Sequence, residues 1–127
     1  MVKFLIAATV ALVVQSAPPP ARPAPLRPDS VRPVLTSYDD MVRCAGLTQA
    51  ASEMEGGESA DGKALFDAAL YWALTASQAA QASGKPGEAS DADQTRARIN
   101  AVRQLNAHDA DARSDLQRCR TQTPDLG

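Results

Sequence analysis

The chain has 127 residues, a length typical of a single domain, and its apolar content of 44% includes few aromatic residues (4% of the chain). Large apolar side chains for a core are therefore scarce, and a covalent staple would be useful. The net charge of −2 excludes the strongly basic composition that is typical of nucleic-acid-binding proteins.

Residues 1–17 have the pattern of a secretory signal peptide. Lys3 precedes an apolar run from Phe4 to Val14, and Val14 and Ser16 provide aliphatic and small residues at −3 and −1 for cleavage before Ala17. The run is much shorter than the ~20 residues that span a bilayer, which favours cleavage over an uncleaved membrane anchor. We therefore expect a periplasmic or secreted protein with no stable membrane insertion after cleavage.

Residues 18–35 are predicted to form a disordered tether. Seven of the nine prolines lie between Pro18 and Pro33. Proline-rich segments adopt extended polyproline conformations, so the segment is expected to act as a spacer. A PxxP recognition motif at Pro20–Pro23 is the alternative interpretation.

The helical domain is predicted to span residues 36–121. Its first helix covers Tyr38–Glu55, with Ser37 as the N-cap and Gly56 after the end. Gly46 lies in the helix interior and suggests a close contact between helices. One apolar face is expected to point inward, made of Met41, Cys44, Leu47, Ala51 and Met54.

The second helix, residues 59–84, is predicted to be the centre around which the domain is organised. Ser59 caps its start, and Gly84 followed by Pro86 ends it. Two adjacent apolar faces indicate contacts with more than one neighbouring helix. They consist of Leu65, Ala69, Trp72, Ala76 and Ala79, and of Phe66, Leu70, Ala73, Ser77 and Ala80. An aromatic binding patch at Tyr71-Trp72 is the alternative to core packing.

The third helix is predicted to begin near Ser90, which has capping-box spacing to Asp93. Its apolar stripe would place Asp109 in the core if the helix continued. The polar residues 106–111 therefore indicate a break, after which Asp109 caps a short fourth helix that ends near Arg120. The inward residues expected in these two helices are Thr95, Ile99, Val102, Leu105, Ala112, Leu116 and Cys119.

These elements predict an all-α fold. We expect a small antiparallel bundle of three long helices and a short fourth helix, stapled by one disulfide and followed by a disordered tail at residues 122–127.

An exported chain with two cysteines most simply pairs them, here Cys44 with Cys119. An unbroken third helix would hold them far apart, whereas a turn at residues 106–109 brings them together by making the last helix antiparallel to the first. An intermolecular or redox-active pair is the alternative.

Charge is unevenly distributed along the domain. Residues 36–93 carry ten acidic and three basic side chains, and residues 94–121 carry six arginines and three aspartates. Nucleic-acid or anionic-lipid binding by the arginine-rich part is one interpretation. We favour the other, in which an acidic half packs beside a basic half of one domain and no nucleic acid is bound.

The chain lacks recognisable catalytic constellations. His108 is the only histidine, and it lies in the predicted break, where an exposed loop residue is expected. There is no CxxC, CxxCH, HExxH or GxSxG motif and no glycine-rich phosphate loop. We therefore predict no catalytic residue, no metal site and no cofactor, and we expect that the protein is not an enzyme.

Three segments carry a resemblance to known proteins: Arg43–Gly46, Ala64–Trp72 and Leu116–Cys119. The chain resembles small exported two-cysteine helical proteins of Gram-negative bacteria over about Tyr38–Pro124. That resemblance implies a periplasmic location and brings no function with it. A looser similarity is to periplasmic acid-stress chaperones, which are also small, helical and held by one disulfide.

Two functions follow as hypotheses. The first is a structural or protein-interaction module with an envelope protein as its unidentified partner, in an oligomeric state that the sequence leaves open. The alternative is an acid- or stress-linked periplasmic chaperone, which exposes apolar surface when its carboxylates become protonated.

Overall fold

The computed structural model describes residues 37–125 and contains four helices. They are α1 (Tyr38–Glu55), α2 (Ala60–Ala82), α3 (Gly87–Asn106) and α4 (Ala110–Gln122). Helix accounts for 83% of the described residues, which include no strand, so the all-α prediction is confirmed. The predicted signal peptide (residues 1–17) and tether (residues 18–35) lie outside the described residues.

Three of the helix starts have the predicted side-chain caps. The Ser37 hydroxyl accepts a hydrogen bond from the Asp40 N–H at 3.1 Å, and the Ser59 hydroxyl accepts one from the Gly62 N–H at 2.9 Å. The Asp109 carboxylate accepts a hydrogen bond from the Ala112 N–H, in the first turn of α4, at 2.8 Å. Each cap satisfies an N–H group that has no partner within its helix.

The predicted start of the third helix at Ser90 is wrong. α3 begins at Gly87, and its N-cap is Pro86, which makes no side-chain capping bond. The fixed φ of proline suits a chain entering a helix, and the Pro86 carbonyl accepts from the Ser90 N–H at 3.2 Å in the first turn. The Ser90 side chain is buried within the domain, and its hydroxyl lies 3.3 Å from the Gln94 amide nitrogen, so it does not cap the helix.

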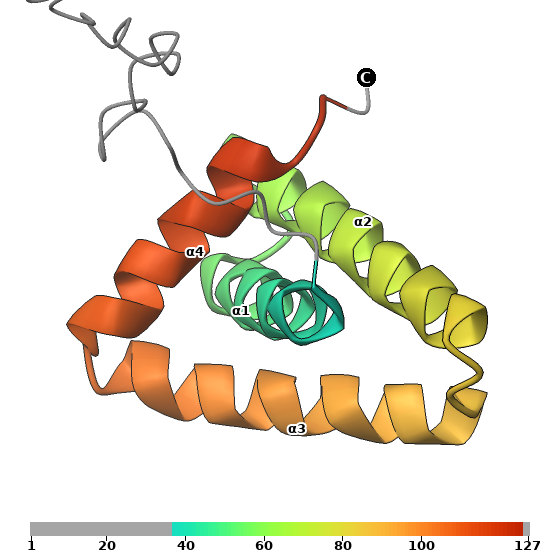
Figure 1. Ribbon diagram of the computed structural model, residues 1–127. Coiled ribbons are helices and arrows are strands. Elements are labelled where there is room, and N and C mark those ends of the chain that lie inside the picture. Colours follow the sequence, from blue (N-terminus) through green and yellow to red (C-terminus); the bar gives the residue numbers. More distant parts are fainter. Residues whose placement is uncertain (1–36, 126–127) are drawn as a thin grey trace, which may run out of the picture. The chain divides into compact units, whose positions relative to one another are not determined.

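The central helix is α1, which corrects the expectation that the chain is organised around residues 59–84. Viewed along α1, the helices α2, α3 and α4 surround it on three sides (Figure 1). Eight of its residues are buried, more than in any other helix. Most of them are small, and small residues let neighbouring helices approach on several sides. α2 is longer but turns only one face to the rest of the domain.

Gly46 lies where α3 crosses α1, and the predicted close contact is confirmed. A Cβ atom at Gly46 would lie 2.5 Å from the carbonyl carbon of Ala97, so the two backbones are in direct contact. Gly62 plays a similar part at the start of α2, where a Cβ atom would lie 1.8 Å from the Gly56 carbonyl oxygen. Both positions therefore require glycine for space.

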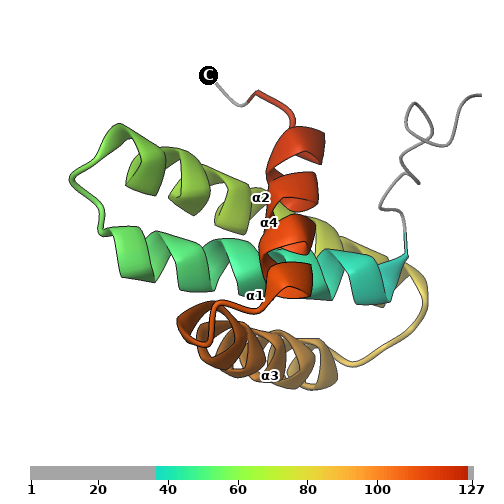
Figure 2. The same cartoon turned by 90° about the vertical axis from the view of Figure 1, so that its left-hand side faces the viewer.

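The predicted break between the last two helices is confirmed. α3 ends at Asn106, and His108 has a φ of 55°, the left-handed conformation that ends many helices. The turn brings Cys119 to Cys44, with a Cα–Cα distance of 5.4 Å, and the two form a disulfide. α4 lies across α1 (Figure 2), so the bridge closes without the antiparallel alignment that we expected from the sequence.

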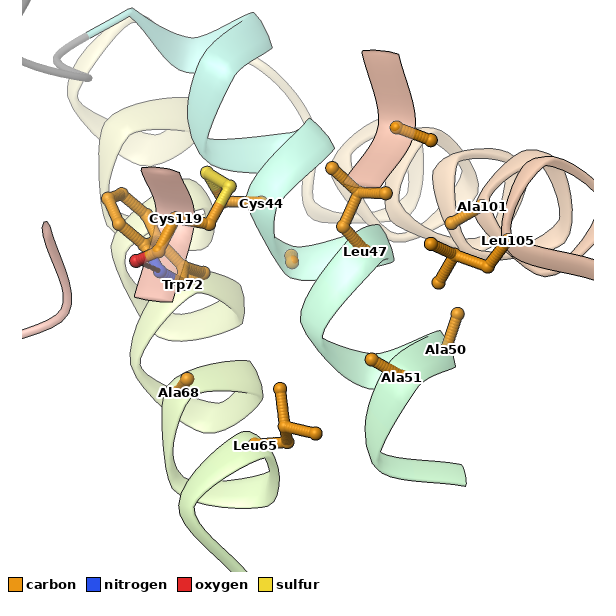
Figure 3. Packing of buried hydrophobic residues seen from close by; sticks show 12 residues of the cluster. Cys44, Leu47, Ala50, Ala51, Leu65, Ala68, Trp72, Ala101, Leu105 and Cys119 are labelled. Atoms are coloured by element: carbon orange, nitrogen blue, oxygen red, sulfur yellow. Dashed lines mark hydrogen bonds between the residues drawn. A yellow bond between two sulfur atoms is a disulfide. The ribbon is translucent and has the colours of Figure 1, made fainter. Parts of the chain in front are cut away.

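The domain extends slightly beyond the predicted boundary at residue 121. α4 ends at Gln122, and the Trp72 indole nitrogen donates to the Thr123 hydroxyl at 2.9 Å and to the Cys119 carbonyl at 3.3 Å. Thr123, within the predicted tail (residues 122–127), thus contacts the core, because a buried indole N–H needs an acceptor. Figure 3 shows Trp72 against Cys119 beside the disulfide.

Candidate functional site

An exposed apolar stripe on α2 is the most unusual surface of the domain. Phe66, Leu70 and Leu74 are 55%, 54% and 61% exposed, respectively. Their spacing of four residues aligns them along one side of the helix. We call these three residues the α2 stripe. The prediction that Phe66 and Leu70 are buried is therefore wrong.

The stripe is exposed because α2 contacts the domain through one face only. Leu65, Ala69, Trp72 and Ala76 are buried as predicted, while no helix among residues 37–125 covers the opposite side. Residues 68–84 contain no charged side chain. Solvent-facing sides of helices are normally charged or polar, so this side has the composition of a contact surface.

A groove adjoins the N-terminal end of the stripe. It has a volume of about 710 Å³ and lies between the last turn of α1, the turn that follows it and the first turns of α2. Its lining consists of Ser52, Glu53, Gly56, Gly57, Lys63, Phe66 and Asp67. We call it the Phe66 groove. The two glycines leave room for a side chain from another molecule.

A second opening lies between the ends of α1 and α3 and the outer side of α4. Met54 lies at the edge of this opening and is 51% exposed, so the prediction that it points inward is wrong. Leu116 is partly buried there, and the exposed His108 and Arg113 contribute to the rim. The volume is about 370 Å³. Arg120, on the same rim, is held by Asp61 at 3.0 Å. The opening has fewer exposed apolar side chains than the α2 stripe.

The third helix is also less buried than predicted. Ile99 is 41% exposed and Thr95 is exposed, whereas Leu105 is buried and Val102 is partly buried. The difference arises because α3 turns another side toward the domain, formed by Ser90, Ala97, Ala101 and Leu105, and Thr95 and Ile99 lie away from it. Ile99 stands apart from the α2 stripe on another helix.

The disulfide is buried and surrounded by an ionic network. Cys44 and Cys119 are 1% and 2% exposed. Beside them the Asp115 carboxylate pairs with Arg43 at 2.9 Å and with Arg118 at 2.8 Å. Thiol–disulfide exchange needs an attacking thiolate to reach a sulfur atom, so this burial favours a structural bridge over a redox-active one.

A second network joins the start of α1 to the start of α3 through Asp93. Lys85 Nζ lies 2.7 Å from Asp93 Oδ2, and the Tyr38 hydroxyl donates to the same oxygen at 2.8 Å. Arg96 pairs with the other carboxylate oxygen. Hydrogen bonds from Lys85, Tyr38 and Arg96 lower the pKa of Asp93 to about 2, and the bond to Asp93 raises the pKa of Lys85.

The acidic and basic halves of the domain do pack together. Four ion pairs join residues 36–93 to residues 94–121. They are Arg43–Asp115, Glu53–Arg98, Asp61–Arg120 and Asp93–Arg96. Part of the arginine-rich segment is thereby neutralised within the domain.

Residues 37–125 contain no group of three His, Cys, Asp or Glu side chains placed to hold a metal ion. In the same range, no helix is both long and apolar enough to cross a bilayer. The two cysteines predicted as a pair are brought together. Within the α2 stripe, sequence reasoning assigned Phe66 and Leu70 to the core and placed Leu74 on neither apolar face.

Fold and surface together define a class: a disulfide-bridged four-helix domain with one uncovered apolar helix face. Comparisons of the chain with protein-family models, curated proteins and solved structures found no match. The resemblance to exported two-cysteine proteins thus stays a prediction.

Proposed function

We propose that the chain is an exported, non-catalytic protein-interaction module that binds its partner through the α2 stripe. The observation that carries this proposal is the exposure of Phe66, Leu70 and Leu74, each more than half exposed, along one side of a helix that has no charged residue after Asp67. Exposed apolar patches of this kind are typical of protein–protein contact surfaces.

Location outside the cytoplasm is part of the proposal. A buried structural disulfide forms and persists in oxidising compartments such as the periplasm. The predicted signal peptide supports the same location.

The alternative, an acid-activated chaperone, receives less support from the charges. The Asp93 carboxylate, which links α1 to α3, keeps its charge until the pH approaches 2, so this link would survive mild acid. The α2 stripe is, in addition, exposed without any acid trigger. Apolar-dye binding that rises steeply between neutral pH and about pH 3, below the ordinary carboxyl pKa values, would favour the chaperone.

Site-specific photocrosslinking in living cells tests the proposed function. A photoreactive residue at position 74 of the full chain is expected to capture a discrete protein product. The matched control is position 99, where Ile99 is also a large, partly exposed apolar residue but belongs to α3. Equal capture at both positions, or none at position 74, would rule out binding through the α2 stripe.

A further inference from the structure

We infer, building on the proposed interaction function, that the α2 stripe binds the same stripe of a second copy of this chain. The two α2 helices would pack antiparallel around a two-fold axis at Leu70. This arrangement is the isologous contact typical of homodimers, in which one patch is complementary to itself.

The stripe has the pattern that such an axis requires. Leu70 lies midway between Phe66 and Leu74, four residues from each. An antiparallel pairing centred on Leu70 therefore places each Phe66 opposite Leu74 of the second copy, and Leu70 opposite itself. Ala73 and Ser77 border the stripe on the side toward the domain, where Ala73 packs against the core and the Ser77 hydroxyl lies 3.2 Å from the Gln94 amide nitrogen of α3. Both are small, so they leave the second helix room to approach.

The charges on α2 favour the antiparallel direction. All charged residues of the helix, Asp61, Lys63 and Asp67, precede residue 68. The register centred on Leu70 places Asp67 opposite Ala73 and Lys63 opposite Ser77, so that no like charges meet. A parallel pair would bring Lys63 against Lys63 and Asp67 against Asp67, and it would also align the two helix dipoles unfavourably.

The surroundings of the stripe favour a protein over an anionic lipid surface. Glu53 and Asp67 line the Phe66 groove, and residues 36–93 carry seven more acidic than basic side chains (ten against three). Negative charge there would be repelled by acidic lipids. Leu74 of the second copy would instead arrive beside Phe66, at the edge of the groove of about 710 Å³.

A contact of one helix stripe is small, so we expect reversible association. Three side chains per copy, each more than half exposed, form a surface well below the ~800 Å² per partner of a standard interface. We expect a dissociation constant on the order of 100 µM for the isolated protein.

Sedimentation velocity of the full exported chain from about 1 µM to about 1 mM, a range that brackets weak interfaces, provides the test. Wild type is expected to shift from monomer to dimer. Leu70→Asp and Leu70→Lys should each stay monomeric, because like charges meet at the axis. An equimolar mixture of the two should dimerise again, and Ile99→Asp, the matched control on α3, should dimerise like wild type.

Three outcomes would overturn the pairing: a wild type that is monomeric throughout, a mixture that fails to recover association, or a loss of association in Ile99→Asp. Recovery in the mixture also shows that the single variants are folded. Crosslinking at position 74 distinguishes self-pairing from the broader proposal that the chain is a protein-interaction module. A product with the mass of two chains supports self-pairing, whereas a product with another exported protein overturns self-pairing and leaves the interaction module standing.

Discussion

Replacing Gly46 by alanine should destabilise the domain, although alanine is the better helix former. The intrinsic helix preference favours alanine by up to about 1 kcal/mol. The added Cβ atom, however, would lie 2.5 Å from the Ala97 carbonyl carbon and 2.7 Å from its oxygen. Ordinary carbon contacts are about 3.5–4.0 Å, so α3 would have to move by about 1 Å.

Overpacking of a core costs about 1–3 kcal/mol, and the upper end applies here because the obstacle is backbone rather than a flexible side chain. Subtracting the helix preference leaves a net loss of about 1–2 kcal/mol. For a domain of this size that loss lowers the melting temperature by roughly 4–8 °C for each kcal/mol. Thermal and urea unfolding followed by circular dichroism would measure it.

Gly87→Ala is the matched control, since it also lies in a helix but has no atom within 4 Å of the added Cβ position. It should leave stability unchanged or slightly raised. Ala97→Gly in the Gly46→Ala background should restore little, because the two shortest contacts are with the Ala97 backbone. A Gly46→Ala protein as stable as wild type would refute the close approach of α1 and α3.

Three further perturbations test the bonds that hold the domain together. The Asp93→Asn variant should be least stable relative to wild type above about pH 4, because the pKa of Asp93 is depressed in the folded state. The difference in unfolding free energy should shrink as the pH falls toward about 2. Urea unfolding at several pH values measures it. Replacing Cys44 and Cys119 by alanine removes a cross-link spanning 75 residues and should cost up to about 4 kcal/mol in denaturant unfolding. Trp72→Phe removes the indole N–H that donates to Thr123 and should cost about 1–2 kcal/mol, with faster hydrogen exchange at the end of α4.

The sequence predicted helix ends well where a side chain itself makes the capping bond. Ser37, Ser59 and Asp109 each accept the bond that their position suggests. The prediction was wrong for the start of α3. There the N-cap is Pro86, which makes no side-chain capping bond, and Ser90, the expected cap, is buried within the domain. Local chemistry decides a cap, so it can be read from a few neighbouring residues.

The identity of the central helix was harder to predict. Apolar periodicity identifies which side of a helix is apolar, but burial of that side depends on where the other helices pass. α2 has the larger apolar residues, yet α1, with its many small residues, allows three neighbours to approach it. The disulfide was predictable because two cysteines allow only one intramolecular pairing.

The adjacent residues Leu65 and Phe66 separate packing from recognition. Leu65 is 2% exposed and Phe66 is 55% exposed, although sequence periodicity predicts both to be buried. Leu65→Ala should therefore cost about 2–5 kcal/mol of unfolding free energy. Phe66→Ala should cost about 1 kcal/mol or less, since much of its surface is already in water, yet it should weaken association of the chain.

Equal destabilisation by the two substitutions would mean that the rest of the domain covers Phe66 in solution, and the α2 stripe would then lose its role as a contact surface. The expected inequality has a simple physical basis. Leaving a few large apolar side chains exposed makes the core smaller and the folded state less stable. The disulfide, which contributes up to about 4 kcal/mol, offsets this loss. A small domain can then keep those side chains available for binding while its core is built largely from alanine.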